Sequence, residues 1–199
     1  MIKKLISIAI LLVLAGGCGN SVKNTMSPGY NQSKPATVAI MPVIWNNPGE
    51  KEDDEIAFLF RKMTSNALLQ KNYRTLALDA VDSKLKENRA SGVNDSTDIS
   101  ADSFLYIRIK EWDKDRLSAY ASLIMKASFE LYSANGTRLW TAEYSTKEFD
   151  LSLDKKTIEY GVFGAYEPRV ERFVEAVLST LPQGEAPKKA EKTFFQWLP

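Results

Sequence analysis

The chain has 199 residues, of which 44% are apolar, 26% charged and 11% aromatic, a composition ordinary for one globular domain. Lysine and arginine number 26 and aspartate and glutamate 25, so the formal net charge is +1. A nucleic-acid-binding surface needs a basic excess and is therefore not expected. The chain contains no histidine, which excludes serine–histidine–aspartate, cysteine–histidine and histidine–metal sites.

The first residues have the parts of a secretory signal. Lys3 and Lys4 form a positive start, and Leu5–Leu14 is a largely apolar run of the length typical of a signal peptide. A membrane-spanning helix needs about 20 apolar residues, so this run is too short to be a permanent anchor. Small residues then lead into Cys18, the only cysteine, so no intramolecular disulfide can form. We predict that residues 1–17 are a signal peptide.

The string Leu14-Ala-Gly-Gly-Cys18 resembles the lipobox of bacterial lipoproteins, although its leucine lies one position further from the cysteine than usual. The resemblance implies that the chain is cleaved before Cys18 and that the thiol is acylated, so that the membrane is a partner through the lipid. Gly19 follows, where an aspartate favours retention in the inner membrane. The resemblance therefore implies an outer-membrane location facing the periplasm. The alternative is an ordinary secretory signal with a chance cysteine.

Residues 18–36 follow the signal. From Asn20 onward they are rich in asparagine, serine, proline and glycine and have no apolar period. Such a segment is typical of a flexible linker. We expect a tether that joins the lipidated cysteine to the domain.

Residues 37–87 predict a β-α-β-α unit. The apolar, β-branched run at 37–44 indicates a strand that is buried on both faces. Pro42 must end its hydrogen-bonded ladder or lie at the edge of that ladder. A helix is expected over 53–70, then a strand at 73–78 and a short helix at 79–87. The apolar stripe of the first helix consists of Ile56, Leu59, Phe60, Met63, Ala67 and Leu68.

The second half predicts strands followed by a helix. Residues 103–112 and 117–131 alternate between apolar and polar side chains, which is typical of strands with one face in solvent. Asn135-Gly136 is a strong hairpin signal between the second of these and a strand at 137–147. A last helix is expected over 168–181, with an apolar stripe.

These elements predict one α/β domain over residues 37–182. Its mixed sheet follows the order β-α-β-α-β-β-β-α, with an antiparallel meander in the second half. Residues 183–199 are expected to be a polar linker with a short apolar tail.

Four motifs occur in an order that resembles an uncharacterised family of bacterial lipoproteins. They are T-V-A-I-M-P at 37–42, A-D-S-F-L-Y-I-R-I-K-E-W at 101–112, Gly136-Thr-Arg-Leu-Trp140 and Leu181-Pro-Gln-Gly184. The similarity covers about residues 36–187. The fold of that family resembles the amino-terminal domain of TolB and the periplasmic domain of the curli-secretion lipoprotein CsgG.

This resemblance implies a periplasmic interaction module in envelope assembly, secretion or transport, and it does not imply catalysis. The chain departs from the family between Asp150 and Glu167, where a polar stretch replaces a glycine-rich apolar insert. If the insert of the family serves membrane contact or oligomerisation, the resemblance does not imply that role for this chain.

The acidic side chains have simple structural explanations. The cluster at Glu50–Glu55 lacks the alternating ligands and the glycine of a calcium loop, and acidic residues are favoured at a helix start. Asp113 and Asp115 fit a turn better than an acid–base pair. We predict no catalytic residue, no metal site and no cofactor.

Aromatic residues supply the candidate interaction surface. They are expected at strand ends, on the polar face of the sheet and in the tail, and they are Trp45, Trp112, Tyr120, Trp140, Phe194, Phe195 and Trp197. Exposed aromatic side chains are enriched at interface hot spots. The alternatives are that a helix covers the first four and that the tail docks on the domain itself.

The leading hypothesis is a lipid-anchored periplasmic module without catalytic activity that binds other envelope proteins. The alternative is an envelope lipoprotein that binds a small ligand or glycan in a groove at the edge of the sheet. A hydrolase that uses carboxylates alone would need two facing acids, and the sequence offers no candidate pair.

Overall fold

A computed structural model of the chain describes residues 21–46, 52–90, 99–113, 122–149 and 162–185. Its helices and strands, in chain order, are β1 (Lys23–Met26), α2 (Tyr30–Ser33), β2 (Thr37–Ile40), β3 (Ile44–Trp45), α3 (Asp54–Gln70), β4 (Arg74–Thr75), α4 (Leu78–Ala90), β5 (Ser103–Asp113), β6 (Ser122–Ser133), β7 (Arg138–Phe149) and α7 (Val162–Leu178).

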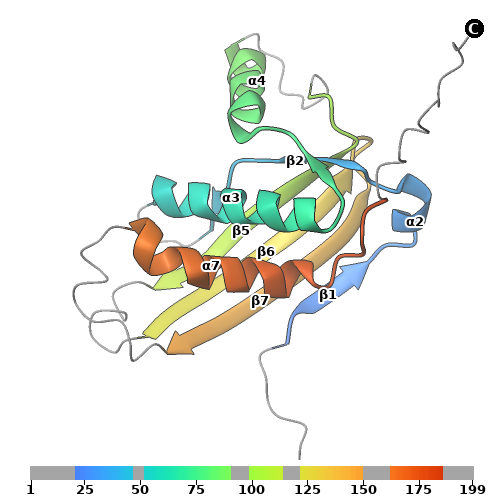
Figure 1. Ribbon diagram of the computed structural model, residues 1–199. Coiled ribbons are helices and arrows are strands. Elements are labelled where there is room, and N and C mark those ends of the chain that lie inside the picture. Colours follow the sequence, from blue (N-terminus) through green and yellow to red (C-terminus); the bar gives the residue numbers. More distant parts are fainter. Residues whose placement is uncertain (1–20, 47–51, 91–98, 114–121, 150–161, 186–199) are drawn as a thin grey trace, which may run out of the picture.

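One mixed sheet holds all the strands of the described residues, as predicted. The strand order is β1-β7-β6-β5-β2-β4, and Figure 1 labels β1, β7, β6, β5 and β2 of this series. Strand β3 pairs with β5 beyond the end of β2. The pairs of β2 with β4 and with β5 are parallel, whereas β5, β6 and β7 form the expected antiparallel meander. The turn at Asn135-Gly136 closes the hairpin, with Gly136 at a φ of 81°, a conformation that glycine adopts without a steric penalty.

Helices α3 and α7 cover one face of the sheet and enclose the main core (Figure 1). The predicted stripe of α3 is buried along its whole length, and Asp53 caps the helix by accepting a hydrogen bond from the backbone N–H of Ile56 at 3.2 Å. The α7 side chains Val170, Phe173, Val174, Val177 and Leu178 join the same core.

Helix α7 begins earlier than the sequence predicted. We expected it to start at Pro168 from the apolar stripe that begins at Val170. The structure starts the helix at Val162, and Pro168 lies inside it. The lack of an N–H at the proline removes one hydrogen bond from the helix.

Helix α4 lies against the opposite face of the sheet, over one corner. Its Val81 is buried in a second cluster with Ala39, Met41, Ile99 and Phe104. Alternation along β2 places Val38 and Ile40 in the main core and Ala39 in the second one. The strand is therefore buried on both faces, as its continuous apolar run indicated.

Pro42 interrupts the first predicted strand. Strand β2 ends at Ile40, and β3 resumes at Ile44 opposite Arg108 of β5. A proline cannot donate to the ladder, so the single predicted strand becomes two short strands along the same neighbour. The predicted strand at 73–78 is also shorter, because only Arg74 and Thr75 pair.

The expectation of a flexible tether over 18–36 is wrong for the part that the structure describes. Residues Lys23–Met26 form β1, which pairs antiparallel with β7 and places Met26 opposite Trp140. Tyr30 of α2 is buried in the main core. No apolar pattern indicated this strand, because the side chains of β1 are all exposed and an exposed edge strand needs no apolar period.

A chain of hydrogen bonds fixes this segment to the rest of the domain. The hydroxyls of Tyr30 and Tyr73 are hydrogen-bonded to each other, and the Tyr73 hydroxyl donates to the carbonyl oxygen of Pro182 at 2.9 Å. Burial raises the pKa of both hydroxyls above the ordinary value of 10.0, so both keep their protons at neutral pH. Three segments that are distant in the sequence therefore meet at one point, which is buried at Tyr30 and Tyr73 and partly buried at the bond to Pro182.

No helix among the described residues is long and apolar enough to cross a membrane.

Replacing Tyr73 with phenylalanine tests whether the amino-terminal segment belongs to the fold. We expect Tyr73→Phe to lower the free energy of unfolding by about 1–3 kcal/mol, because it leaves the Tyr30 hydroxyl and the Pro182 carbonyl without their partner. Urea unfolding followed by tryptophan fluorescence measures the change. Tyr30→Phe keeps the bond to Pro182 and should cost less. Wild-type stability of Tyr73→Phe would contradict the hydrogen-bond chain.

Candidate functional site

Several residues that the sequence proposed for function lie outside the described part of the chain. These are the predicted lipidation site Cys18 and four members of the predicted aromatic surface, Tyr120, Phe194, Phe195 and Trp197. Their roles stay predictions.

Two tryptophans of the predicted interaction surface are buried instead. Trp112 is 3% exposed, and its ring makes edge contacts with Tyr166 and Phe60, at centroid distances of 5.2 and 6.1 Å. Trp140 is fully buried in the main core. Helices α3 and α7 cover this face of the sheet, which is the alternative that the sequence left open. The prediction of an exposed interaction role is wrong for both.

Trp45 is the described tryptophan that stays at the surface. It is half-buried at the end of β3, packs partly against the main core and lines a cleft next to α3 and α4. The predicted aromatic surface is therefore reduced to one described residue.

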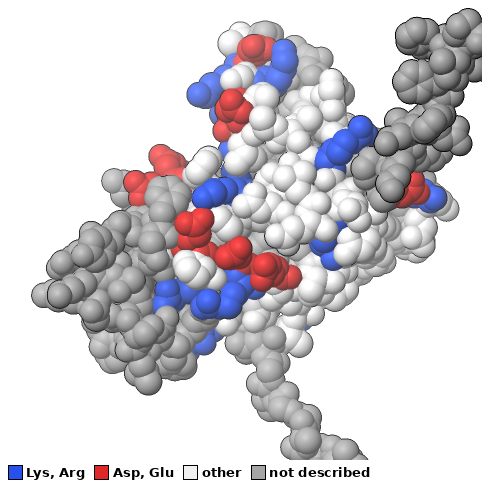
Figure 2. All heavy atoms as spheres, viewed as in Figure 1, with Lys and Arg blue, Asp and Glu red and all other residues white. Residues whose placement is uncertain are grey.

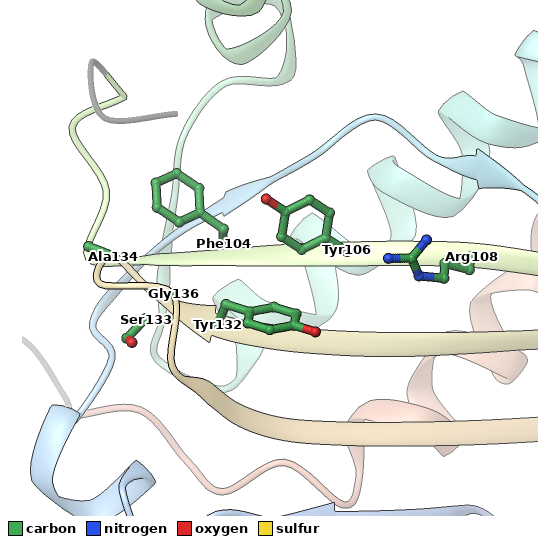
Figure 3. Close-up of a pocket in the computed structure, with 7 residues that line it drawn as sticks. All are labelled: Phe104, Tyr106, Arg108, Tyr132, Ser133, Ala134 and Gly136. Carbon is green, nitrogen blue, oxygen red and sulfur yellow. The ribbon is translucent and has the colours of Figure 1, made fainter. Parts of the chain in front are cut away.

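The opposite face of the sheet carries an aromatic groove that the sequence analysis did not single out (Figure 3). Phe104 and Tyr106 of β5 and Tyr132 of β6 lie beside the turn at Ala134–Gly136, and Arg108 follows along β5. The groove has a volume of about 210 Å³. Tyr106 and Tyr132 pack edge to face with their ring centroids 5.6 Å apart, as diagonal neighbours on adjacent strands can.

Polar contacts hold the groove in shape. The Tyr132 hydroxyl donates to Oε2 of Glu130 at 3.1 Å, and Nε of Arg108 lies 3.7 Å from the same oxygen. Burial raises the pKa of the Tyr106 and Tyr132 hydroxyls, so both are neutral hydrogen-bonding groups at physiological pH. The groove offers aromatic edges, two hydroxyls and one guanidinium.

Ion pairs continue along the same face. Lys110 Nζ donates to Glu143 Oε2 at 2.7 Å, and Lys126 Nζ lies 3.4 Å from Glu143 Oε1. The hydrogen bond from Lys110 is the main cause that lowers the pKa of Glu143, against the opposing effect of burial. This face is polar and partly solvated, as the alternation in the sequence predicted.

A second and larger cleft lies where α3 and α4 leave the sheet. It has a volume of about 360 Å³. The described residues that line it are Pro42, Val43, Trp45, Glu52, Asp54, Ala57, Phe58, Arg61, Asp82, Leu85, Lys86 and Arg89.

Arg61 is the buried charge of this cleft, with 6% of the residue exposed. Its Nη1 donates to Oδ2 of Asp82 at 2.9 Å and its Nη2 to the carbonyl of Ile40 at 3.0 Å. The guanidinium therefore joins α3, α4 and the end of β2.

Charges of both signs lie next to one another on the helix-covered side of the molecule (Figure 2). Lys62 of α3 and Glu167 of α7 form one such pair at 2.9 Å. Within the described ranges, no group of three or more cysteine, aspartate or glutamate side chains is placed to hold a metal ion.

Together these features define a mixed α/β domain with one helix-covered face, one open face and a cleft at the sheet edge. No protein-family model and no curated protein matches the chain.

Solved structures share the fold. PelC from Paraburkholderia phytofirmans, a dodecamer, matches with 17% identity over 84% of this chain and 99% of its own, at a TM-score of 0.52. The lipoprotein GNA1162 from Neisseria meningitidis matches with 18% identity over 73% of this chain and 96% of its own, at a TM-score of 0.50. At these identities the likeness shows a common fold.

Sequence signals for the two sites were present but weak. Tyr106 and Arg108 stand on the polar side of an alternating strand, and that pattern indicates solvent as readily as a groove. Arg61 lies at the margin of the apolar stripe of a predicted helix, and only the packing of α4 shows which group its charge contacts. The partners in both sites come from distant segments.

The pH dependence of the open face can be measured at Glu143. Because its folded pKa is lowered, its ion pairs stabilise the fold fully above the ordinary value of 4.5 and lose that effect as the pH falls through the folded pKa. Carbon-13 NMR of the carboxyl group should give a midpoint below 4.5. Lys110→Met should raise this midpoint more than Lys126→Met, because Lys110 makes the shorter contact. Equal effects of the two variants would contradict the assignment.

Proposed function

We propose that this protein is a lipid-anchored module of the bacterial envelope that binds other envelope proteins and catalyses no reaction. It is held by acylated Cys18 at the outer membrane, faces the periplasm and takes part in an assembly, secretion or transport complex. The observation that carries the proposal is the string Leu14-Ala-Gly-Gly-Cys18 directly ahead of a folded domain.

The distance between the anchor and the domain supports a role close to the membrane. Val22 already packs partly against the main core, four residues after Cys18. Fully extended, four residues span at most about 14 Å. A lipid on Cys18 would hold the edge of the sheet at β1 near the bilayer, instead of letting the domain move freely on a long linker.

The groove on the open face supports a binding role. Tyrosine and arginine are over-represented at the centres of protein interfaces, and Tyr106, Tyr132 and Arg108 lie together there. The sequence contains no histidine, so the proposed absence of catalysis agrees with the exclusion of the common nucleophile–histidine machinery.

The shared fold supports the same class of function by analogy. PelC forms a dodecamer and GNA1162 is a lipoprotein, so this fold occurs in envelope-type and self-assembling proteins. The resemblance of the sequence motifs to lipoproteins with TolB-like and CsgG-like folds is part of this proposal. Partners accordingly include other envelope proteins and further copies of the chain.

Cys18→Ala tests the anchor. We expect the wild-type protein in the outer-membrane fraction with an acylated amino-terminal cysteine, and the variant unprocessed or released from that fraction, because no thiol remains to carry the lipid. Membrane fractionation and intact-mass spectrometry measure both. Ser21→Ala, an exposed change close by, is the matched control and should behave as wild type. An unmodified wild-type cysteine, or a variant that stays in the outer membrane, would overturn the proposal.

The double variant Tyr106→Ala, Tyr132→Ala tests the groove. We expect the yield of the main crosslinked partner in intact cells to fall about tenfold or more, the effect of removing interface hot spots. Quantitative mass spectrometry of crosslinked membranes measures the yield. Leu69→Ala, at the exposed end of α3, is the control and should keep it. An unchanged yield in the double variant would exclude this groove as the docking surface.

A further inference from the structure

The larger cleft lies at the point in the sheet where α/β folds bind ligands. Strands β4, β2 and β5 are parallel neighbours. After β2 the chain enters α3 on one face, and after β4 it enters α4 on the other, as the two separate cores show. Adjacent parallel strands whose connections leave to opposite faces open a crevice at their carboxyl ends. The cleft of about 360 Å³ is lined by Pro42 and Val43, just past the end of β2.

Two residues that line this cleft each carry a buried polar atom that has no hydrogen-bond partner among the described residues. These atoms are Nε of Arg61 and Oδ1 of Asp82. The Nη1 and Nη2 atoms of Arg61 donate to Asp82 and to the carbonyl of Ile40. The Nε–H group therefore remains without an acceptor among the described residues. A buried unpaired polar group costs free energy, and a ligand that pairs with both atoms would remove that cost.

The chemistry of the two atoms restricts the ligand. Arginine Nε only donates and an ionised carboxylate oxygen only accepts, whereas a hydroxyl group does both. A ligand with neighbouring hydroxyls can accept from Arg61 and donate to Asp82 at once. A simple anion cannot satisfy the carboxylate, and a simple cation cannot satisfy the guanidinium.

The remaining lining favours a neutral ligand with an apolar surface. Among the described lining residues, the acidic Glu52, Asp54 and Asp82 balance the basic Arg61, Lys86 and Arg89. Trp45 is half-buried and Phe58 is 46% exposed, so two aromatic rings stand at the cleft. The volume lies near the lower end of the range for small-molecule sites, which suits one or two sugar rings.

We infer that this cleft is a binding site for a neutral saccharide, whose hydroxyls pair with Arg61 and Asp82 and whose ring packs against Trp45 or Phe58. This activity is distinct from the proposed protein–protein role, because it uses the sheet edge and not the open face. It also does not depend on lipidation. The ligand is either a free sugar or the end of a longer glycan, since both present the same hydroxyls.

Saturation-transfer NMR and equilibrium dialysis on the purified lipoprotein test the site. The probes are glucose, N-acetylglucosamine and their disaccharides maltose and chitobiose, in a detergent without a sugar headgroup. We expect saturable binding of at least one probe. Tighter binding of a disaccharide than of its monomer would indicate a glycan end, and the reverse a free sugar.

Variants assign the binding to the cleft. Asp82→Asn and Phe58→Ala should each weaken binding, the first by about tenfold to a hundredfold because it replaces a charged hydrogen-bond acceptor. Phe58 is exposed, so Phe58→Ala should keep the melting temperature even if Asp82→Asn does not. Leu69→Ala removes an exposed apolar side chain at the far end of the same helix and is the matched control.

Three outcomes would overturn the inference. They are the absence of binding by all four sugars, unchanged binding in both cleft variants, and preferential binding of inorganic phosphate, which would make the cleft an anion site. Because the measurement uses purified protein, its failure leaves the anchoring and crosslinking results untouched. Failure of those experiments likewise leaves the sugar measurement valid.

Discussion

The guanidinium of Arg61 connects α3, α4 and the end of β2, and these three elements border the larger cleft. It is buried, pairs with Asp82 of α4 and donates to the carbonyl of Ile40 at the end of β2. A buried charge is tolerated only when such partners surround it. Because α3 and α4 lie on opposite faces of the sheet and β2 lies between them, this one side chain joins the two helix layers. The cleft and its two unpaired atoms follow from the same arrangement.

The distribution of the helices decides which face of the sheet is accessible to a binding partner. Helices α3 and α7 cover the meander on one side, whereas on the other side α4 covers a corner and no other described helix packs there. The uncovered strands therefore carry ion pairs such as Lys110–Glu143 and the aromatic groove around Tyr106. The same division buries Trp112 and Trp140, which had been expected at the surface.

In the proposed function, the pairing of β1 with β7 places the domain close to its membrane anchor. A linker of the expected length would uncouple the domain from the lipid, but the segment from Val22 onward belongs to the fold. The hydrogen bonds from Tyr30 through Tyr73 to Pro182 hold it there. In the proposed function, the short connection to Cys18 fixes the β1 edge of the sheet towards the bilayer. The open face and the cleft beyond β2, at the other end of the strand order, are left for partners and ligand.

The sequence by itself determined the class of fold, the paired hairpin, the interruption at Pro42 and the stripe of α3, because apolar periodicity and turn chemistry are local properties. Only the tertiary structure decided the pairing of Lys23–Met26, the burial of Trp140 and the meeting of Arg61 with Asp82. Each of these joins segments that are distant in the sequence. No local pattern encodes such contacts, since they depend on which faces the helices cover and where the strands end.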